Sequence, residues 1–529
     1  MTRQFHEAKY YWVRRALYMA LGVLNAVPIG VEAQPIRGLF HNEDETDFFW
    51  HGPLSEEKAG ETIDRYIEVM ADAGVKVFVC NTNARRTIYR SRVWDACWDG
   101  YDSAGPDDQP FLAPIPRQEV AGFRRGIANM LAVYRAGIDY PARVVERCRH
   151  HKMSPWISLR MNDCHCNDIP DHPFHGSFWK KNPQFRRQNV SGYFATNLDY
   201  AHPEVRDFYK ALVIETLERY DIDGLELDFM REPYLFSAGK EAEGAKTLTQ
   251  WLRQIRKLTA DAAAVRGHPI RVGVRVPSQP EVALGWGLDA ITWAKQGLID
   301  VLAVTPRWAT LEFDMPIQQW REMLVDSKVT LVGGLEVRYQ PYPGGPATIV
   351  TPELATGAAA SVLSQGADAV YLFNYFQNSI GWPRPVYLST LKAMDSLDLL
   401  QRRPRSIGIT YRDVIGPQEN YRAPLPVTGK ELVFLVKLGP GVEKDSLCDV
   451  LIGFALSQDA PMAIPTVLVN GQACTVRDNT TKEGLRLISF GVPKAALAGA
   501  EVCEIKISST DRKDLDARRV EMCLRKANE

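Results

Sequence analysis

The chain has no excess of charge of either sign. Its 529 residues carry 63 Lys and Arg against 64 Asp and Glu, a formal net charge of -1. A nucleic-acid-binding protein is expected to show a basic stripe or patch, and none dominates this sequence. The composition disfavours a nucleic-acid partner and is typical of a soluble enzyme or binding protein. The length exceeds one ordinary domain and allows a large core.

The N-terminal region lacks an apolar run long enough for a membrane span. Arg14 and Arg15 precede the uncharged run 16–31, which is short for a spanning helix. A basic region, a short apolar core and the small residue Ala33 at its exit predict a secretory signal peptide over residues 1–33. We therefore expect no membrane anchor and export to the periplasm or the extracellular space. The alternative is an N-terminal helix packed on the domain.

The cysteines do not form a recognisable framework. Nine cysteines cannot all pair within one chain. Cys164 and Cys166 flank His165 in NDCHCND, which resembles a metal-ligand cluster, but no second CxxC or HxxxH supplies further ligands. His41-Asn42 stands where a metal amidohydrolase would carry His-x-His. The sequence therefore predicts neither a metal nor another cofactor.

What the chain does have is an unusual strand, Tyr220–Arg231, with the sequence YDIDGLELDFMR. Apolar residues alternate there with Glu226 and Asp228. A strand buried on both faces should be almost wholly apolar, and burying a bare charge is costly. The two carboxylates are therefore expected to face a polar cavity, as at the mouth of a parallel barrel. Alternatively, they are structural acids bonded to neighbouring arginines.

Strand-like and helix-like segments alternate along residues 34–402, which predicts a parallel sheet. Eight strand–helix pairs predict a (β/α)8 barrel, the TIM-barrel architecture of the α/β class. Residues 403–529 contain short alternating strands separated by turns, which predict an antiparallel β-sandwich domain. Seven of the eight barrel strands are expected at 36–41, 76–81, 155–161, 270–276, 301–305, 330–337 and 369–373, and the fourth is the motif 220–231.

Polar residues follow every one of these strands, which predicts a functional mouth at the carboxyl ends. Several are arginines, and guanidinium groups that converge on one point indicate a carboxylate, sulfate or phosphate ligand. Some of these arginines are instead expected to pair with barrel acids. In chain order the set is Asn42, Asp44, Asp47, Asn81, Asn83, Arg85, Arg160, Asn162, Asp163, His165, Asp228, Arg231, Arg275, Arg307, Trp308, Glu336, Arg338, Asn374 and Tyr375.

Two catalytic pairs compete. A barrel glycosidase commonly uses carboxylates at the ends of strands four and seven, here Asp228 and Glu336. The second pair is Asp47 after strand one and His165 after strand three. Imidazole exchanges protons near neutral pH, and a nearby carboxylate fixes its tautomer.

These intervals resemble the inverting exo-sialidases of glycoside hydrolase family 156. The residues that carry the resemblance are Asn42, Asp47, Arg160, His165, Arg231 and Asn374. The resemblance implies that Asp47 and His165 are catalytic and that Arg160 and Arg231 hold the carboxylate of the substrate. It also implies that Asn42 and Asn374 bind the sugar, and that no tyrosine nucleophile acts. Which of the catalytic pair is the acid and which the base stays open.

The expected function is hydrolysis of terminal α-linked sialic acid from glycoconjugates, with inversion. The enzyme alternative is a glycosidase for another anionic sugar, which uses Asp228 and Glu336; in the first reading these two line the substrate site. A sugar-binding barrel without catalysis is the third reading. The partners are therefore sialylated or other anionic saccharides, and a homodimer is left open.

Overall fold

The computed structural model describes residues 35–44, 46–439, 446–456 and 463–526. The signal peptide expected at 1–33 lies outside these residues. Across the described ranges, no helix combines the length and apolar character that a membrane crossing requires.

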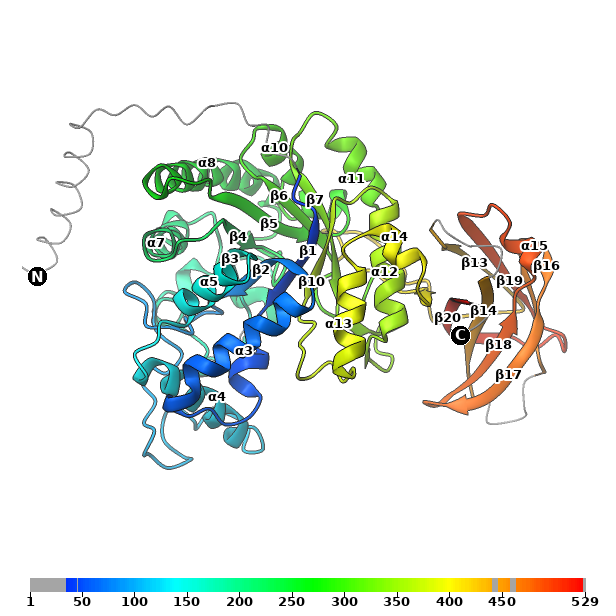
Figure 1. The fold of residues 1–529 in the computed structure, drawn as a ribbon, viewed down its shortest axis with the longest axis horizontal. Helices are drawn as coiled ribbons and strands as arrows, with labels where there is room; N and C mark the ends of the chain where they lie inside the picture. The colour runs from blue at the N-terminus through cyan, green and yellow to red at the C-terminus, as the bar shows by residue number, and fades with distance from the viewer. Residues whose placement is uncertain (1–34, 45, 440–445, 457–462, 527–529) are drawn as a thin grey trace, which may run out of the picture. The chain divides into compact units, whose positions relative to one another are not determined.

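Eight parallel strands close into a barrel in the order β1-β10-β7-β6-β5-β4-β3-β2, and helices surround it (Figure 1). With the antiparallel sheets that follow, this confirms the predicted fold class. The barrel strands are β1 (Gly38–Glu43), β2 (Val75–Asn81), β3 (Ser154–Arg160), β4 (Gly224–Asp228), β5 (Arg271–Pro277), β6 (Val301–Thr305), β7 (Thr330–Glu336) and β10 (Ala369–Phe373).

The helices begin and end at residues suited to those positions. Helix α12 begins where the Thr351 side chain accepts a hydrogen bond from the backbone N–H of Leu354, and α8 ends at Gly267 with φ +80°. The longer helices are α3 (Ala59–Asp72), α4 (Val120–Arg135), α5 (Tyr140–His150), α7 (Pro203–Arg219), α8 (Glu241–Arg266), α12 (Pro352–Ser364) and α13 (Arg384–Ala393). Shorter ones are α2 (Thr46–Trp50), η1 (Glu56–Lys58), α6 (Ser177–Lys181), η2 (Pro183–Phe185), η3 (Tyr193–Thr196), α9 (Pro280–Gly285), α10 (Ala290–Lys295), α11 (Ile317–Met323), α14 (Leu397–Gln401) and α15 (Lys494–Leu497).

Several connections contain more than the one helix that eight strand–helix pairs predict. Helix α4 precedes α5 between β2 and β3. After β10, α13 and α14 are separate helices, because Ser396 caps the start of α14 through a hydrogen bond from the backbone N–H of Leu399.

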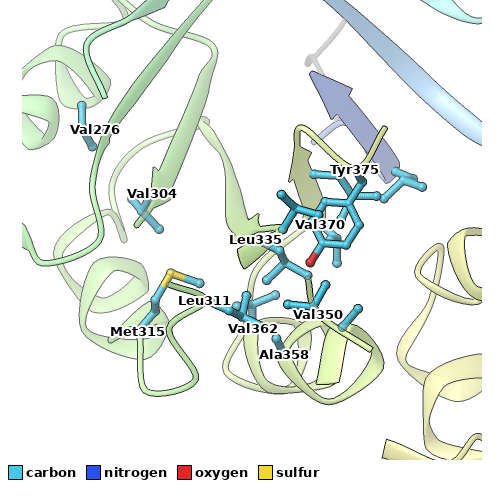
Figure 2. Packing of buried hydrophobic residues seen from close by; sticks show 14 of the residues in the cluster. Val276, Val304, Leu311, Met315, Leu335, Val350, Ala358, Val362, Val370 and Tyr375 are labelled. Atoms are coloured by element: carbon cyan, nitrogen blue, oxygen red, sulfur yellow. The ribbon is translucent and has the colours of Figure 1, made fainter. Parts of the chain in front are cut away.

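Apolar side chains fill both sides of the barrel wall. On the outer side, Leu335 of β7 and Val370 of β10 pack near Ala358 and Val362 of α12 (Figure 2). On the inner side, a separate cluster contains residues from alternate strand positions. Its members are Phe40, Val77, Val79, Trp156, Val301, Ala303, Val332, Ala369, Tyr371 and Phe373. The barrel interior is therefore apolar at its base, and polar side chains can gather only toward the mouth.

Residues 405–526 form two antiparallel sheets, ordered β11-β20-β14-β18-β17 and β13-β19-β15-β16, with β12 on β20. The sequence pattern predicts six of these strands, at 407–411, 431–437, 450–456, 466–469, 485–490 and 502–507, whereas it does not predict β12, β16, β17 or β20. Their bounds are β11 (Arg405–Gly408), β12 (Val427–Gly429), β13 (Glu431–Lys437), β14 (Ser446–Ala455), β15 (Thr466–Val469), β16 (Gln472–Ala473), β17 (Thr475–Lys482), β18 (Leu485–Gly491), β19 (Val502–Ser508) and β20 (Leu515–Lys526). A small hairpin, β8 (Arg338–Tyr339) with β9 (Thr348–Ile349), follows β7.

The sheets and the barrel share close contacts. The Tyr339 hydroxyl of β8 donates a 2.7 Å hydrogen bond to Glu521 of β20. Gly357 of α12 lies so near β11 that an added Cβ would stand 2.0 Å from the carbonyl oxygen of Ser406. After β11 the chain returns to the barrel, where the Asp413 carboxylate accepts backbone hydrogen bonds from the loop that follows β6.

Candidate active site

The alternation of the strands determines which polar residues face the inside of the mouth. On β1, Phe40 belongs to the inner cluster, so Asn42 and then Asp44 continue on the same side. The register pairs Arg160 of β3 with Asp228 of β4, and Asp228 with Arg275 of β5. Charged residues from adjacent strands therefore form one row across the mouth.

Asp44 lies at the centre of a buried network on one side of the mouth. Its Oδ2 accepts hydrogen bonds from Arg160 Nη2 at 2.7 Å and from Asn374 Nδ2 at 3.2 Å. Arg160 also donates to Asp163 Oδ2 at 3.3 Å, and its side chain is only 3% exposed. Asn374 adopts a left-handed backbone with φ +60° directly after β10, a conformation that asparagine tolerates better than most residues.

His165 joins this network through Asp163. Its Nδ1 lies 2.8 and 2.9 Å from the two carboxylate oxygens of Asp163, and its Nε2 lies 3.2 Å from Arg231 Nη2. Burial alone would raise the pKa of Asp163, but His165 and Arg160 hold this pKa well below its usual range. The ionised Asp163 therefore keeps the proton on Nδ1, and Nε2 accepts from Arg231.

His165 differs from its partners in exposure. Its side chain is 42% exposed, whereas that of Asp163 is 2% exposed. A buried carboxylate thus orients an accessible imidazole, an arrangement suited to proton transfer with a bound molecule. We call Asp44, Arg160, Asp163, His165, Arg231 and Asn374 the rim network.

Arg231 adds positive charge beside the imidazole. Burial and the neighbouring Arg160 lower the pKa of its guanidinium. Its Nε has no hydrogen-bond partner in the described part of the chain. A planar anion that reaches this guanidinium could therefore gain N–H donors at low cost.

Asp47 lies apart from these contacts, on α2. Its Oδ1 accepts from the Ser379 hydroxyl at 2.9 Å, and its Oδ2 accepts from Asn378 Nδ2 at 3.0 Å and from the Tyr66 hydroxyl at 3.5 Å. Burial raises the pKa of Asp47 although these hydrogen bonds oppose the shift. Both oxygens are thus occupied by neighbouring side chains rather than by His165.

A second group of acids lies deeper in the barrel. Glu226 Oε1 accepts from Asn42 Nδ2 at 3.1 Å and from the Tyr371 hydroxyl at 2.9 Å. Asp228 Oδ2 accepts from Arg275 Nη1 at 2.9 Å. Burial and the nearby Asp228 raise the pKa of Glu226 to about 7. Asn42 and Asp228 thus bind barrel residues, as in the structural alternative raised from the sequence.

Glu336 is the third acid of this deeper group, and it accepts the fewest hydrogen bonds of the three among the residues described. Its Oε1 accepts from the backbone N–H of Val337 at 2.9 Å, whereas Oε2 has no partner among the residues described. Burial raises the pKa of Glu336 to about 8, against the opposing effect of Arg275 and Arg231. Arg275 is fully buried and stacks on Phe373, with 3.7 Å from its Cζ to the ring centroid. We call Glu226, Asp228 and Glu336 the inner acids.

The structure brings some of the sequence-derived candidates together and adds two. Arg160, His165, Arg231 and Asn374 belong to the rim network, whereas Asn42, Asp228 and Glu336 lie with the inner acids. Asp44 and Asp163 were noted from the sequence only as polar strand ends. The inward positions Phe40 and Asn42 would have identified Asp44, and the short Asp-x-His spacing would have identified Asp163.

The NDCHCND segment does not form a ligand cluster. Cys164 is buried, and its burial raises the pKa of the thiol. Within the described ranges, no three or more His, Cys, Asp and Glu side chains gather where they could hold a metal ion.

Comparison with known proteins places part of this barrel beside glycoside hydrolases. Residues 122–266 match the family described as Glycosyl hydrolase-like 10 (GHL10). This span runs from α4 to the end of α8 and includes Asp163, His165, Asp228 and Arg231. No curated protein matches the chain.

Solved structures with a similar arrangement include two glycosidases. The glycoside hydrolase domain of PgaB (BpsB) from Bordetella bronchiseptica has 12% identity and a TM-score of 0.40, covering 68% of this chain and 99% of that one. Alpha-L-fucosidase isoenzyme 1 from Paenibacillus thiaminolyticus has 13% identity and a TM-score of 0.33, covering 90% and 97%. The family match therefore links residues 122–266 to glycosyl hydrolase-like proteins.

Proposed function

We propose that this protein is a glycoside hydrolase that releases a terminal anionic sugar, specifically α-linked sialic acid, with inversion. The observation that carries the proposal is the environment of His165. A buried carboxylate holds one imidazole nitrogen, an arginine meets the other, and the side chain stays exposed. The family match over residues 122–266 supports glycoside hydrolysis as the chemistry.

The contact between Arg231 and His165 supports an anionic substrate. A sialoside carries a carboxylate on its anomeric carbon. If this carboxylate accepted hydrogen bonds from Arg231, the positive charge beside Nε2 would be offset and the imidazole could take up a proton. Asp163 would stabilise the resulting imidazolium through its contact with Nδ1, and His165 would then donate the Nε2 proton to the departing oxygen.

Inversion also requires a base that activates water. Asp44 is the carboxylate best placed for this role, because it is ion-paired with Arg160 and shares the rim network with His165. The pairing of Asp47 with His165 that the family resemblance implies remains the alternative. Arg160, already bonded to Asp44 and Asp163, would position the base as well as attract the substrate.

The second candidate is hydrolysis of another anionic sugar, such as a uronic acid, by Asp228 and Glu336. The raised pKa of Glu336, about 8, favours this reading, because a general acid must hold its proton at neutral pH. The ion pair between Asp228 and Arg275 weighs against it, since both oxygens of Asp228 already accept hydrogen bonds.

The deciding experiment is incubation of the protein with an aryl α-sialoside, with the first product followed by proton NMR. Direct attack by water predicts β-sialic acid before mutarotation, and no transfer to added methanol. Early α-product or methyl α-sialoside would mean retention through a covalent intermediate. Turnover of aryl uronides alone would select the second candidate, and binding of sialic acid without turnover would indicate a sugar-binding barrel.

We also propose that the protein is exported, on the strength of the sequence pattern over residues 1–33. Sequencing the N-terminus of the protein recovered from its native host tests this proposal. A mature chain that begins near Gln34 is expected, and an intact N-terminus inside the cell would contradict it.

A further inference from the structure

One tryptophan at the mouth stands apart from the others. Of the tryptophans in the ranges that the structure describes, Trp308 alone is exposed, with 43% of its surface accessible. It lies in the loop that follows β6. A single exposed apolar residue is ordinary on a protein surface, so exposure by itself carries no function.

The backbone that presents Trp308 is firmly held. The Asp413 carboxylate accepts backbone hydrogen bonds from Arg307 at 3.0 Å, Trp308 at 2.7 Å and Ala309 at 2.6 Å. The Arg307 guanidinium donates two 3.1 Å hydrogen bonds to Glu232. The backbone of Trp308 and the side chain of Arg307 are thus fixed, although the indole surface remains open to water.

Arg338, which follows β7, stacks on this ring. Its Cζ lies 4.0 Å from the ring centroid of Trp308. Its Nε is buried and has no hydrogen-bond partner within the part of the chain that the structure describes. The exposed part of the indole therefore offers an apolar surface beside the guanidinium of Arg338.

Trp308 is also close to the rim network along the mouth. Its neighbour Arg307 pairs with Glu232, which directly follows Arg231, and Arg231 Nη2 contacts His165. Strands β6 and β7 supply this sector, whereas β1, β3, β4 and β10 supply the rim network. A ligand that reaches His165 would therefore extend over the sector of Trp308.

We propose that Trp308 and Arg338 bind the leaving-group sugar, a neutral hexose next to the bond that is cleaved. The flat apolar face of a pyranose ring would stack on the indole, and one of its hydroxyls would accept from Arg338. This inference rests on the proposed glycosidase function and adds the part of the substrate that the rim network does not recognise. Because Asp413 fixes the backbone of this loop and Arg338 stacks on the indole, little conformational freedom is lost on binding.

The test compares two leaving groups on the same anionic sugar. Trp308→Ala should lower kcat/KM for sialyllactose by about tenfold, the effect of losing one well-packed aromatic contact. The same variant should leave kcat/KM for methyl α-sialoside within about twofold, since methanol cannot stack; an effect below 0.5 kcal/mol is expected there. Trp308→Phe should retain most of the sialyllactose activity.

The matched control is Tyr134→Ala. Tyr134 is 45% exposed and contacts Arg90 at 5.5 Å from its ring centroid, but it lies on α4. This variant should leave kcat/KM unchanged for both substrates. Equal losses on both substrates in Trp308→Ala, or no loss on either, would overturn the inference.

Titration of lactose against the inactive variant His165→Ala separates this inference from the identity of the cleaved sugar. Adding Trp308→Ala to that background should weaken lactose binding by about tenfold, whereas adding Tyr134→Ala should not. Unchanged lactose affinity would refute the platform even if sialosides are cleaved. Weakened lactose affinity would support it even if the anionic sugar proves to be a uronic acid.

Discussion

The rim network and the inner acids lie in the same mouth but differ in how their charges are satisfied. In the rim network, Arg160 and Asp163 are ion-paired, and the exposed imidazole of His165 completes the group. Among the inner acids, burial raises the pKa of Glu226 to about 7 and that of Glu336 to about 8. The rim network thus consists of paired charges, whereas burial favours the protonated forms of Glu226 and Glu336 among the inner acids.

Under the proposed function, we infer from this difference that the rim network serves recognition and catalysis, whereas the inner acids support the barrel. Ionised groups with an exposed member can meet an anionic substrate at once, because their hydrogen bonds already favour the charged forms. Asp228 is committed to Arg275, and its removal would leave a buried cation without a partner. We therefore assign proton transfer to the rim network and expect the inner acids to act mainly through stability.

The largest expected effect on activity comes from the rim network. His165→Ala and Asp44→Asn should each lower kcat by about 10² or more, the usual scale for general acid–base groups. Steady-state kinetics on the sialoside measures this, with circular dichroism to verify folding. Asp47→Asn provides the comparison. If kcat falls by about 10² in Asp47→Asn but not in Asp44→Asn, the pairing implied by the family resemblance is correct.

Substitution of an inner acid should instead lower the stability of the fold. Asp228→Ala leaves the buried Arg275 unpaired and should lower the free energy of unfolding by about 3–5 kcal/mol. Urea denaturation measures the change. The matched control is Asp261→Ala, which breaks an exposed pair with Lys257 and should cost less than about 1 kcal/mol. If the Asp228→Ala variant were stable but inactive, the catalytic groups would be the inner acids rather than the rim network.

Substitution of the arginines by lysine should give a smaller effect. Arg160→Lys and Arg231→Lys should each weaken sialic acid binding by about tenfold to a hundredfold, since lysine cannot reproduce a bidentate fork. Arg143→Lys is the control, because Arg143 makes a similar fork on Asp64 between α5 and α3. Calorimetric titration that shows equal affinity in all variants would mean that the rim arginines serve only the barrel.

The barrel was predictable because its strands repeat the same pattern. Strand β6 begins at Val301 and ends at Thr305 as expected, since a short apolar run between turns has few alternatives. Helix α4 was missed although Phe123, Ile127 and Met130 have helical spacing, because one helix was expected for each strand. Strand β17 was missed because all eight of its residues are exposed and no apolar pattern marks it.

Strand β20 and Asp44 show two other limits. The pairing of β20 with β14 shifts register at Phe454 of β14, which lies opposite Ala517. The alternation in β20 is interrupted there, because buried Ala517 is followed by buried Val520 at an odd spacing. At the mouth, the sequence identified which residues end the strands but not which of them touch. The choice between Asp44 and Asp47 depends on side-chain contacts across β1, β3 and β10, which no interval in the sequence records.

The last expected effect concerns the proton on Glu336. Its pKa is raised from 4.5 in the unfolded chain to about 8 in the folded protein. The folded state therefore holds one more proton between these values, and stability must fall as pH rises, by about 1.4 kcal/mol per pH unit. Glu336→Gln should remove this slope, and Glu226 contributes equally to both proteins. Urea denaturation between pH 5 and pH 8, at about one-unit steps, measures the difference. Parallel pH profiles would show that Glu336 is ionised and paired with Arg275, and the contrast between the two groups would disappear.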